Sequence, residues 1–533
     1  MAMPLSKSGI PLAFVPQQLH YDTPHAPATF HAQESRKHIQ GHYMVILKNG
    51  VDATTFLAHR EAVASAQDST TARLAQGEAK GIRHIFDSQG VMQGYSGSFT
   101  PDVLAYIRAH PEVEYVEQDS IVTTQEMEDD GRNVWQEDYP PSIKASSDGI
   151  SAQQIERLSP WGLVRISHRE GVSFKNFGQY LYNVHGGEGV TAYVIDTGIN
   201  IYHDEFEGRA RWGKTMPDDA DVDGNGHGTH CAGTIGSNKY GVAKKAELVA
   251  VKVLGSGGSG SMSDVTGGVL WAVEDAKAKT KAMAANPSSA AAKKHRGFVA
   301  NMSLGGGRSP SLDKAVNGAV TSGLHFAVAA GNENQDACNV SPAGAENPVT
   351  VGASTLDDLR ASFSNVGKCV DVFAPGLNIK STWNTGNTST NIISGTSMAT
   401  PHVVGMLAYL LSIYGSDEFT KINDVLPSGH PLDIAAANSF DISDFSTSIA
   451  GKLTNLLPIP ALALEFVGGL FGGNKHQQVQ LLAPTPKPPG VGSVLHPFDL
   501  KKAMAKLSTP GVLKDVNGSP NLLIFNNATK DSP

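Results

Sequence analysis

Five short apolar runs between residues 190 and 353 constrain the fold more than any other feature of this sequence. They lie at 190–196 (VTAYVID), 247–254, 297–304, 324–330 and 348–353. Stretches with helical spacing, such as 263–284 and 312–322, lie between several of them. Strands that are apolar on both faces and alternate with helices are typical of a parallel sheet covered by helices on both sides. We therefore predict an α/β domain over residues 156–414.

Active sites of such sheets lie beyond the carboxyl ends of the strands, where this sequence places polar residues. Asp196 ends the first run and Asn332 follows the fourth. Ser397, in SGTSMATPH (394–402), precedes a helical pattern with almost no polar face, and Pro401 fits a first helical turn. A serine at the start of a buried helix is rigidly held among outward-pointing N–H groups and suits a nucleophile. The plainer alternative is a helix N-cap.

Three stretches together offer a Ser-His-Asp relay. Ser397 would lose its proton to His227, in DGNGHGTHCAG, while Asp196, in IDTG, would orient and stabilise the imidazolium. The order Asp, His, Ser along the chain is one of three known for this geometry.

Each piece also has a rival interpretation. IDTG is typical of an aspartic protease half-site, but no second DTG or DSG occurs. His227 and His230 are spaced i, i+3, but no glutamate follows as in the HExxH zinc motif. A nucleophile elbow around Ser397 would need a later histidine as base, and it would leave the DTG and HGTH segments unexplained.

Residues 42–122 alternate in the order β-α-β-β-α-β, which is the ferredoxin-like pattern. We expect a small α+β domain at 37–122, preceded by a leader or disordered N-terminus at 1–36. An acidic linker with Pro140-Pro141 and many serines follows at 123–155 and should be exposed and easily cut.

A second break in the pattern covers residues 415–496, which are rich in Pro, Ser and Gly. We expect a flexible surface insertion, with a membrane-associating or partner-binding segment, or translated intervening sequence, as alternatives. The apolar stretch 453–472 contains two prolines and a glutamate, so no transmembrane segment is expected. A helix at 497–507 and a strand at 521–525 should complete the α/β domain over 497–527, with a tail at 528–533.

Composition excludes some classes of protein. A chain of 533 residues should hold more than one domain, and a net charge of −9 with a pI of about 6.1 argues against nucleic acid as a partner. Three cysteines are too few for a disulfide scaffold, and their odd number leaves at least one free thiol.

Five ordered motifs carry a family resemblance. VIDTGIN, DGNGHGTHCAGTIG, NMSLGGG, AVAAGNEN and SGTSMATPHVVG resemble segments of the subtilase family, closest to the proteinase K branch and its fungal vacuolar, cerevisin-like members. The resemblance covers about 160–414 and 497–526. It implies a subtilisin-like, mostly parallel sheet, and 42–122 resembles the inhibitory propeptide of the same family.

The resemblance also implies an activity. The chain would be a self-processing zymogen of a serine endopeptidase with broad, apolar or aromatic preference. Asp196, His227 and Ser397 would form the triad, and Asn332 would join the Ser397 N–H in the oxyanion hole. The maturation site stays open within 123–160. A catalytically silent binding or antigenic protein on a subtilase scaffold is the alternative.

Two glycine-rich segments resemble the extended edges of the family's substrate cleft, which pair with a peptide as added strands. The residues implied are Gly258, Ser259, Gly260, Ser303, Leu304, Gly305 and Gly306.

The resemblance further assigns the cysteines and one acidic residue. Cys231 would be a buried free thiol, and a Cys338–Cys369 disulfide would support a secretory route. Asp358 would be a calcium ligand beside backbone carbonyls near Glu346 and Pro348, or else an exposed turn aspartate.

We expect no cofactor for catalysis. The expected partners are protein and peptide substrates and the chain's own propeptide, and we expect a monomer. The location would be the secretory pathway, either vacuolar or extracellular, although the leader is poorly defined.

Overall fold

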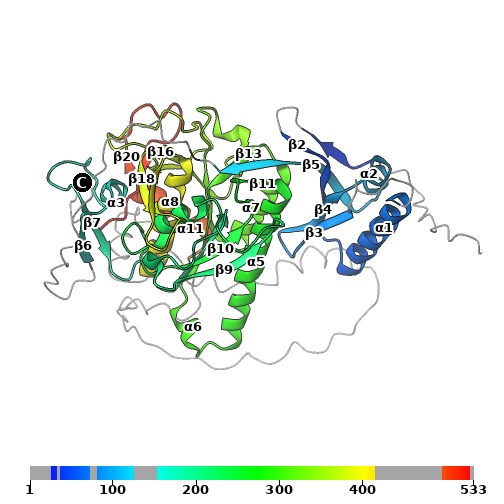
Figure 1. The fold of residues 1–533 in the computed structure, drawn as a ribbon, viewed down its shortest axis with the longest axis horizontal. Helices are drawn as coiled ribbons and strands as arrows, with labels where there is room; N and C mark the ends of the chain where they lie inside the picture. The colour runs from blue at the N-terminus through cyan, green and yellow to red at the C-terminus, as the bar shows by residue number, and fades with distance from the viewer. Residues whose placement is uncertain are drawn as a thin grey trace, which may run out of the picture.

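The computed structural model describes residues 26–32, 37–71, 81–124, 126, 153–414 and 495–528, which form a larger and a smaller lobe (Figure 1). The larger lobe is built on a nine-stranded sheet in the order β20-β21-β17-β16-β14-β12-β8-β10-β9. All neighbours in it are parallel except β20 and β21. The strands are β20 Thr509–Pro510, β21 Leu522–Leu523, β17 Val372–Pro375, β16 Val349–Ser354, β14 His325–Ala329, β12 Gly297–Met302, β8 Val190–Asp196, β10 Glu247–Lys252 and β9 Ala210–Thr215.

Helices cover both faces of this sheet, as the alternation of apolar runs predicted. Ala192 and Val194 of β8 join the core cluster that holds α4 (His227–Gly236) and α8 (Thr396–Ile413). Tyr193 and Ile195 point the other way, into the cluster of α5 (Met262–Ala285) and α7 (Pro310–Thr321). Shorter helices lie at α3 (Trp161–Ile166), α6 (Ala290–Lys294) and α11 (Pro497–Leu507).

Helix α8 crosses the centre of the larger lobe. Among the described residues it alone is long and apolar enough to cross a membrane, yet 94% of that stretch is buried inside the protein. Its composition is therefore that of a core helix. The apolar stretch 453–472 lies outside the described residues.

The smaller lobe has the predicted ferredoxin-like arrangement. Its sheet runs β5-β2-β4-β3, with α1 (Ala53–Thr71) and α2 (Pro101–Arg108) packed against it. The strands are β2 His38–Leu47, β3 Gly81–Ser88, β4 Met92–Ser98 and β5 Val113–Thr124.

Two short strands lie where the sequence predicted a leader and a linker. β1 (Thr29–His31) pairs in parallel with β5, and β6 (Gln153–Arg157) forms a hairpin with β7 (Gln179–Asn183). Strands this short carry no clear alternation of apolar and polar residues, and their partners supply the pairing. A further hairpin joins β18 (Ile379–Thr382) to β19 (Thr390–Ile393).

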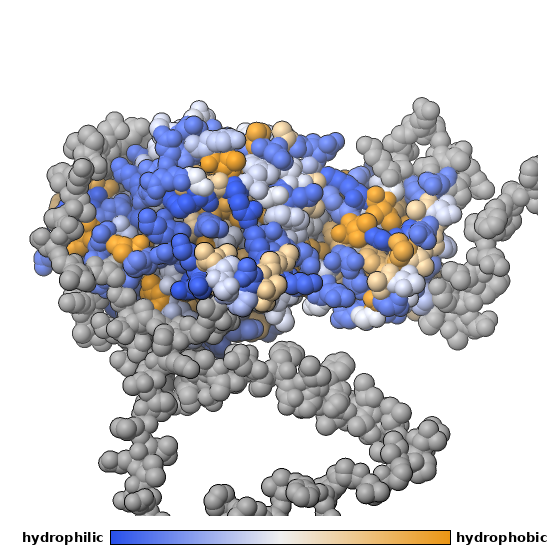
Figure 2. All heavy atoms as spheres, turned by 90° about the horizontal axis from the view of Figure 1, so that it is seen from below, coloured by the Kyte–Doolittle hydropathy of each residue, from blue (hydrophilic) through white to orange (hydrophobic). Residues whose placement is uncertain are grey.

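The smaller lobe packs against α5 and α7 at one end of the larger lobe (Figure 1). The two lobes also touch in the space-filling view from below (Figure 2). Met44, Phe86 and Val122 of the smaller lobe belong to the same buried cluster as Val265 and Leu312 of the two helices. The two lobes therefore share a continuous apolar core.

Two buried carboxylates of β5 fix this contact at helix N-termini. Glu117 accepts a hydrogen bond from the Ser311 N–H at the start of α7, 3.0 Å away. Asp119 accepts from the N–H and the hydroxyl of Ser263 at the start of α5, at 3.1 and 2.6 Å. The free N–H groups and positive end of a helix dipole favour such anions. Burial still raises the pKa of Asp119.

Candidate active site

The topology brings three of the predicted residues together at the carboxyl end of the sheet. Asp196 is the last residue of β8, His227 the first of α4 and Ser397 the second of α8. α4 and α8 pack beside each other in one core cluster. All three side chains are fully buried.

Asp196 and His227 form a charge-assisted pair. His227 Nδ1 donates to Asp196 Oδ1 at 2.7 Å, and the Thr197 N–H donates to the same oxygen at 2.7 Å. Burial alone would lower the pKa of His227, but the charge and hydrogen bond of Asp196, with smaller effects of Glu126 and Asp223, raise it to about 9. The pair therefore stabilises an imidazolium. His227 Nε2 has no hydrogen-bond partner among the described residues.

Asp223, which the sequence analysis did not single out, shapes the loop before His227. Its Oδ1 accepts from the Thr197 hydroxyl at 2.9 Å and from the Gly226 N–H at 2.9 Å. Its Oδ2 accepts from both the N–H and the hydroxyl of Thr229, at 2.9 and 2.6 Å. One buried carboxylate thus ties the end of β8 to the start of α4. Asp223 could have been found in the sequence as the first residue of the DGNGHGTH motif, four positions before His227.

Ser397 is held on both sides by Ser303. The Ser397 hydroxyl donates to the Ser303 carbonyl at 2.8 Å, and the Ser303 hydroxyl donates to the Ser397 carbonyl at 2.9 Å. Cys231 Sγ also lies 3.5 Å from that carbonyl. In this state the Ser397 proton therefore points to Ser303 and not to His227.

Pro401 explains why the Ser397 carbonyl is free to accept these bonds. Pro401 is the sixth residue of α8, so the prediction that it lies in the first turn was wrong by one turn. A proline there has no N–H to donate to the residue four positions earlier, which is Ser397. The carbonyl therefore needs another donor, and Ser303 supplies it.

Asn332 lies beside the start of α8, and of the two polar atoms of its side chain only the oxygen is hydrogen-bonded. Its Oδ1 accepts from the Thr396 N–H and hydroxyl, at 3.0 and 2.9 Å. Its Nδ2 is buried and has no hydrogen-bond partner among the described residues. The amide is therefore fixed by its oxygen and presents an unused donor, which is the arrangement expected of an oxyanion-binding group.

The two predicted cleft segments lie on either side of β5. β11 (Ser259–Ser261) and β13 (Leu304–Gly307) both pair antiparallel with it. Thr123 lies opposite both Ser259 and Gly305, and Gly260 and Leu304 face its neighbours in the strand. The smaller lobe thus inserts its last strand where a substrate peptide would add one.

Some of the predicted cleft residues have other roles. Gly306 pairs with Ser341 of β15 (Val340–Ser341), and Ser303 lies between β12 and β13, where it holds Ser397. Gly258, in contrast, contacts the inserted strand, because its carbonyl accepts the Thr124 N–H at 3.0 Å. At Gly260 a Cβ would come within 2.5 Å of the Val253 carbonyl, so close packing requires glycine there.

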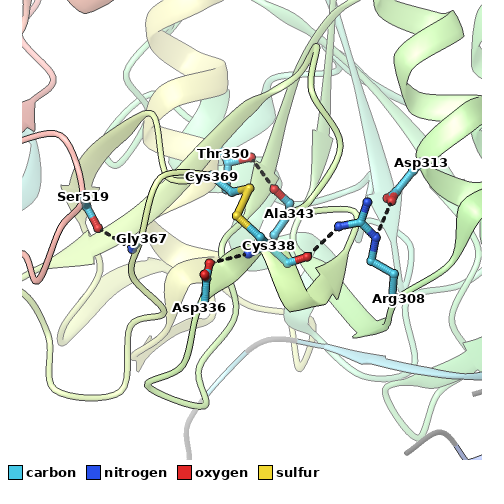
Figure 3. The surroundings of a disulfide bond; sticks show 9 residues. All are labelled: Arg308, Asp313, Asp336, Cys338, Ala343, Thr350, Gly367, Cys369 and Ser519. Carbon is cyan, nitrogen blue, oxygen red and sulfur yellow. Dashed lines mark hydrogen bonds and ion pairs between the residues drawn. A yellow bond between two sulfur atoms is a disulfide. The ribbon is translucent and has the colours of Figure 1, made fainter.

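The cysteines follow the predicted pattern. Cys338 and Cys369 form a disulfide with a Cα–Cα distance of 5.3 Å (Figure 3). It closes a loop over 31 positions, which in the chain-entropy view contributes about 3–4 kcal/mol. Arg308 donates to the Cys338 carbonyl and pairs with Asp313 beside it. Cys231 is free and buried, and burial raises the pKa of its thiol well above the usual range.

The assignment of calcium to Asp358 does not fit the structure. Arg165, only 1% exposed, donates from Nε and Nη2 to the two oxygens of Asp358, at 2.7 and 3.2 Å. Both carboxylate oxygens therefore already face a guanidinium. Asp358 is instead the partner of a buried arginine.

The carbonyls of Glu346 and Pro348 also face a cation of the chain itself. Lys501 of α11 donates to them at 3.4 and 2.6 Å and pairs with Asp371 at 2.9 Å. The sequence analysis missed Lys501 because it lies more than 150 positions from both carbonyls.

Two other histidines near the site have structural roles. His230 donates through Nε2 to the Ile379 carbonyl at 2.9 Å, and burial lowers its pKa to about 3. His402 donates through Nδ1 to the Met398 carbonyl at 2.8 Å, and burial lowers its pKa to about 4. Both imidazoles are therefore neutral and bonded within the fold.

The fold and the site define a class of protein, and comparison with known families names it. The profile of the subtilase family matches residues 187–427, and that of the peptidase inhibitor I9 family matches residues 42–125. The chain belongs to the subtilase family. It is a serine endopeptidase made with an inhibitory propeptide, which is the smaller lobe.

Similar proteins come from fungi. Alkaline protease 2 of Aspergillus fumigatus is 48% identical over 445 residues, covering 81% of this chain and 84% of that protein. Subtilisin-like protease 8 of Trichophyton verrucosum is 48% identical over 466 residues, covering 85% and 88%. A crystal structure of a cold adapted subtilisin-like serine proteinase matches with 34% identity and a TM-score of 0.47, covering 69% of this chain and 98% of that one.

Proposed function

We propose that Ser397 is the nucleophile of this endopeptidase, with His227 as general base and Asp196 as the carboxylate that orients it. The 2.7 Å bond between His227 and Asp196 carries this assignment, because it fixes the imidazole through Nδ1 and leaves Nε2 without a partner among the described residues. The Ser397 hydroxyl, now bonded to the Ser303 carbonyl, would turn to His227 Nε2, which has no hydrogen-bond partner in the part of the chain that the structure describes. Asn332 Nδ2 and the Ser397 N–H would bind the oxyanion.

The chemistry then proceeds in two halves. His227 takes the Ser397 proton as Oγ attacks the scissile carbonyl, and the Asp196 carboxylate stabilises the imidazolium. His227 next protonates the leaving amine, and water hydrolyses the acyl-enzyme by the same route in reverse. Apart from water and the substrate, all groups that take part in these reaction steps belong to the chain, and subtilases need no cofactor for them.

Labelling with a fluorophosphonate tests the assignment. We expect one label per molecule, on Ser397, once the propeptide has been removed, because the reagent mimics the attacked carbonyl. A folded mature sample that takes no label would favour the alternative of a silent binding protein on this scaffold. Buried Asp196, His227 and Ser397, together with the buried Nδ2 of Asn332 beside the start of α8, speak against that alternative.

We expect a substrate peptide to lie in the cleft as β5 does, in extended form between β11 and β13. Backbone pairing of this kind is tolerant of sequence, which supports broad specificity. The preference for apolar or aromatic side chains rests on the family resemblance. We also propose residues 123–155 as the region of processing and 156–414 with 497–527 as the catalytic domain.

Acidity should loosen the propeptide. His59 donates to Glu112 at 3.0 Å and lies 2.9 Å from the Tyr95 hydroxyl, with the His110 ring edge-on at 4.7 Å. Burial lowers the pKa of His59 below its usual 6.5. Below about pH 6.5, His59 therefore binds a proton in the unfolded chain but stays neutral in the folded lobe until the pH is lower. The free energy of unfolding consequently falls as pH falls. Burial would raise the pKa of Glu112, but bonds from His110 and His59 hold it well below its usual range, so its stabilisation is also lost in acid.

Hydrogen exchange of the Ser397→Ala precursor measures this effect. Amides of residues 42–124 should exchange faster at pH 5.5 than at 7.5, after correction for intrinsic rates, with little change in 190–353. His59→Gln should flatten that dependence, whereas His42→Gln, at a partly exposed position, should keep it. Equal slopes in the two variants would contradict the role of His59.

For calcium, we propose that Arg165 and Lys501 supply the positive charge at the positions where the resemblance implied the ion. Lys501→Met should lower stability by about 1–2 kcal/mol, since one charge-assisted group at a partly exposed site is lost. It would also free three oxygens that suit Ca²⁺. Melting curves should show a gain from millimolar calcium in Lys501→Met but not in wild type or the exposed control Lys502→Met. The same calcium response in all three proteins would contradict this proposal.

We further propose that the protein travels the secretory pathway as a monomer. The Cys338–Cys369 disulfide and the propeptide support this route, because disulfides persist in oxidising compartments. A net charge of −9 supports the absence of nucleic acid among its partners. Fractionation of the native source would decide between a vacuolar and an extracellular enzyme.

A further inference from the structure

The loop that carries Asn332 has no regular structure of its own. β14 ends at Ala329, and residues 330–335 belong to no helix or strand. One contact holds this loop to the start of α8, because the Gly331 N–H donates to the Thr396 hydroxyl at 3.2 Å. An oxyanion donor must be held in place before the oxyanion forms, so the loop needs further support.

Asn365 gives this support through both polar atoms of its side chain. Its Oδ1 accepts from the N–H groups of Glu333 and Gln335, at 3.1 and 3.0 Å. Its Nδ2 donates to the Ala330 carbonyl at 2.8 Å and to the Glu333 carboxylate at 2.9 Å. Its backbone N–H also donates to the Gly331 carbonyl at 2.9 Å. These bonds reach the loop on both sides of the oxyanion asparagine.

Gly331 shows how closely the Asn365 side chain packs against the loop. A Cβ at Gly331 would lie only 2.2 Å from Asn365 Nδ2, and its φ of +103° favours glycine as well. Asn365 is 0% exposed, so its amide has no solvent-filled space into which it could move. The absence of a side chain at Gly331 therefore leaves the room that the Asn365 amide occupies.

The segment that carries Asn365 is itself tied to the same loop. The Val366 N–H donates to the Gln335 carbonyl at 2.9 Å. A few residues further along both segments, the disulfide between Cys338 and Cys369 joins them covalently (Figure 3). Asn365 therefore lies between the sheet and a covalent bond, which limits its own movement.

We propose that Asn365 is a positioning residue of the oxyanion hole, which fixes the loop that presents Asn332 Nδ2 and does not itself touch the substrate. This inference rests on the proposed role of Asn332. A donor that is already in place needs no reorganisation when the oxyanion forms, so it stabilises the transition state more than a mobile donor does. Substrate binding between β11 and β13 should not depend on Asn365.

A double-mutant cycle on the mature enzyme, measured by steady-state kinetics on a peptide amide, tests the proposal. Asn365→Ala should lower kcat by about 10–100-fold with little change in KM, because a small displacement of a catalytic group can cost about 10²-fold. In an Asn332→Ala background, the same substitution should lower kcat by no more than about twofold, because the group that Asn365 positions is gone. A substitution that only loosened the fold would act equally in both backgrounds.

Asn176→Ala is the matched control. Asn176 is buried, and it holds the loop between α3 and β7 with the same pattern of bonds. Its Oδ1 accepts from the Ser173 N–H at 2.7 Å, and its Nδ2 donates to the Gly171 carbonyl at 3.2 Å. That loop supplies none of the proposed catalytic groups, so Asn176→Ala should lower the melting temperature and keep kcat within a few-fold of wild type.

The outcomes separate this inference from the proposed function. If Asn332→Ala alone left kcat unchanged, the assignment of the oxyanion donor would fail. If Asn332→Ala lowered kcat but Asn365→Ala left it unchanged, or lowered it equally in both backgrounds, only the positioning role would be overturned. Asn365→Asp keeps the acceptor and removes the donor, and it takes the place of Asn365→Ala in the cycle if the alanine variant does not fold.

Discussion

Replacing Ser397 by alanine should leave the chain at its full mass of 56.2 kDa and lower peptide hydrolysis by about 10⁶-fold, as loss of the nucleophile does in subtilisin. The methyl group cannot attack, and no other hydroxyl among the described residues lies at the start of α8 with its proton on the Ser303 carbonyl. Gel mobility after refolding measures the first effect. Hydrolysis of a chromogenic peptide by the refolded variant, which keeps its propeptide, is compared with that by the mature wild type and should show a loss of at least this size.

The triad should behave as one unit in this experiment. His227→Ala should cost about as much as Ser397→Ala, and the double variant no more than either, whereas Asp196→Ala should cost about tenfold to a hundredfold less. Ser412→Ala provides a matched control in the same helix, since its hydroxyl bonds to the Gly187 N–H far from the site. A Ser397→Ala precursor that still shortens by itself would identify another nucleophile.

The sheet could be predicted from the sequence because its strands are apolar on both faces. The run at 190–196 coincides with β8, and the helix at 497–507 with α11. Asp196, His227 and Ser397 came together because each ends or begins an element at the same edge of that sheet. The alternation of apolar runs and helical stretches in the sequence predicts where each strand or helix ends, and therefore where these residues lie.

Contacts between distant parts of the chain could not be predicted from these local sequence patterns. Ser303 and Ser397 are 94 positions apart, and their reciprocal hydrogen bonds exist only in the folded protein. The same is true of Arg165 and Asp358, which are 193 positions apart. Because of their ion pair, Asp358 binds an arginine where the sequence analysis expected a calcium ligand. The apolar run 297–304 likewise divides at Ser303, because the chain there leaves β12 to form β13.

Asn332 should contribute about 3–4 kcal/mol to transition-state binding, so Asn332→Ala should lower kcat by about 10²–10³-fold with little change in KM. Among the described residues its Nδ2 has no hydrogen-bond partner, and we therefore expect it to gain a bond only when an oxyanion forms. An interaction made only in the transition state affects kcat and kcat/KM equally. Steady-state kinetics of the mature enzyme on a peptide amide measures both constants.

The oxygen of Asn332 requires a separate control. Alanine would also remove the acceptor of the Thr396 N–H and hydroxyl, so part of the loss could come from a displaced helix start. Asn332→Asp keeps that acceptor and removes only the donor, and it should be at least as inactive because a carboxylate repels the oxyanion. Thr396→Ser keeps the hydroxyl that holds Asn332 and should retain activity within a few-fold. If Asn332→Asp were nearly as active as wild type, the orphan Nδ2 would have no part in catalysis, and the Ser397 N–H alone would bind the oxyanion.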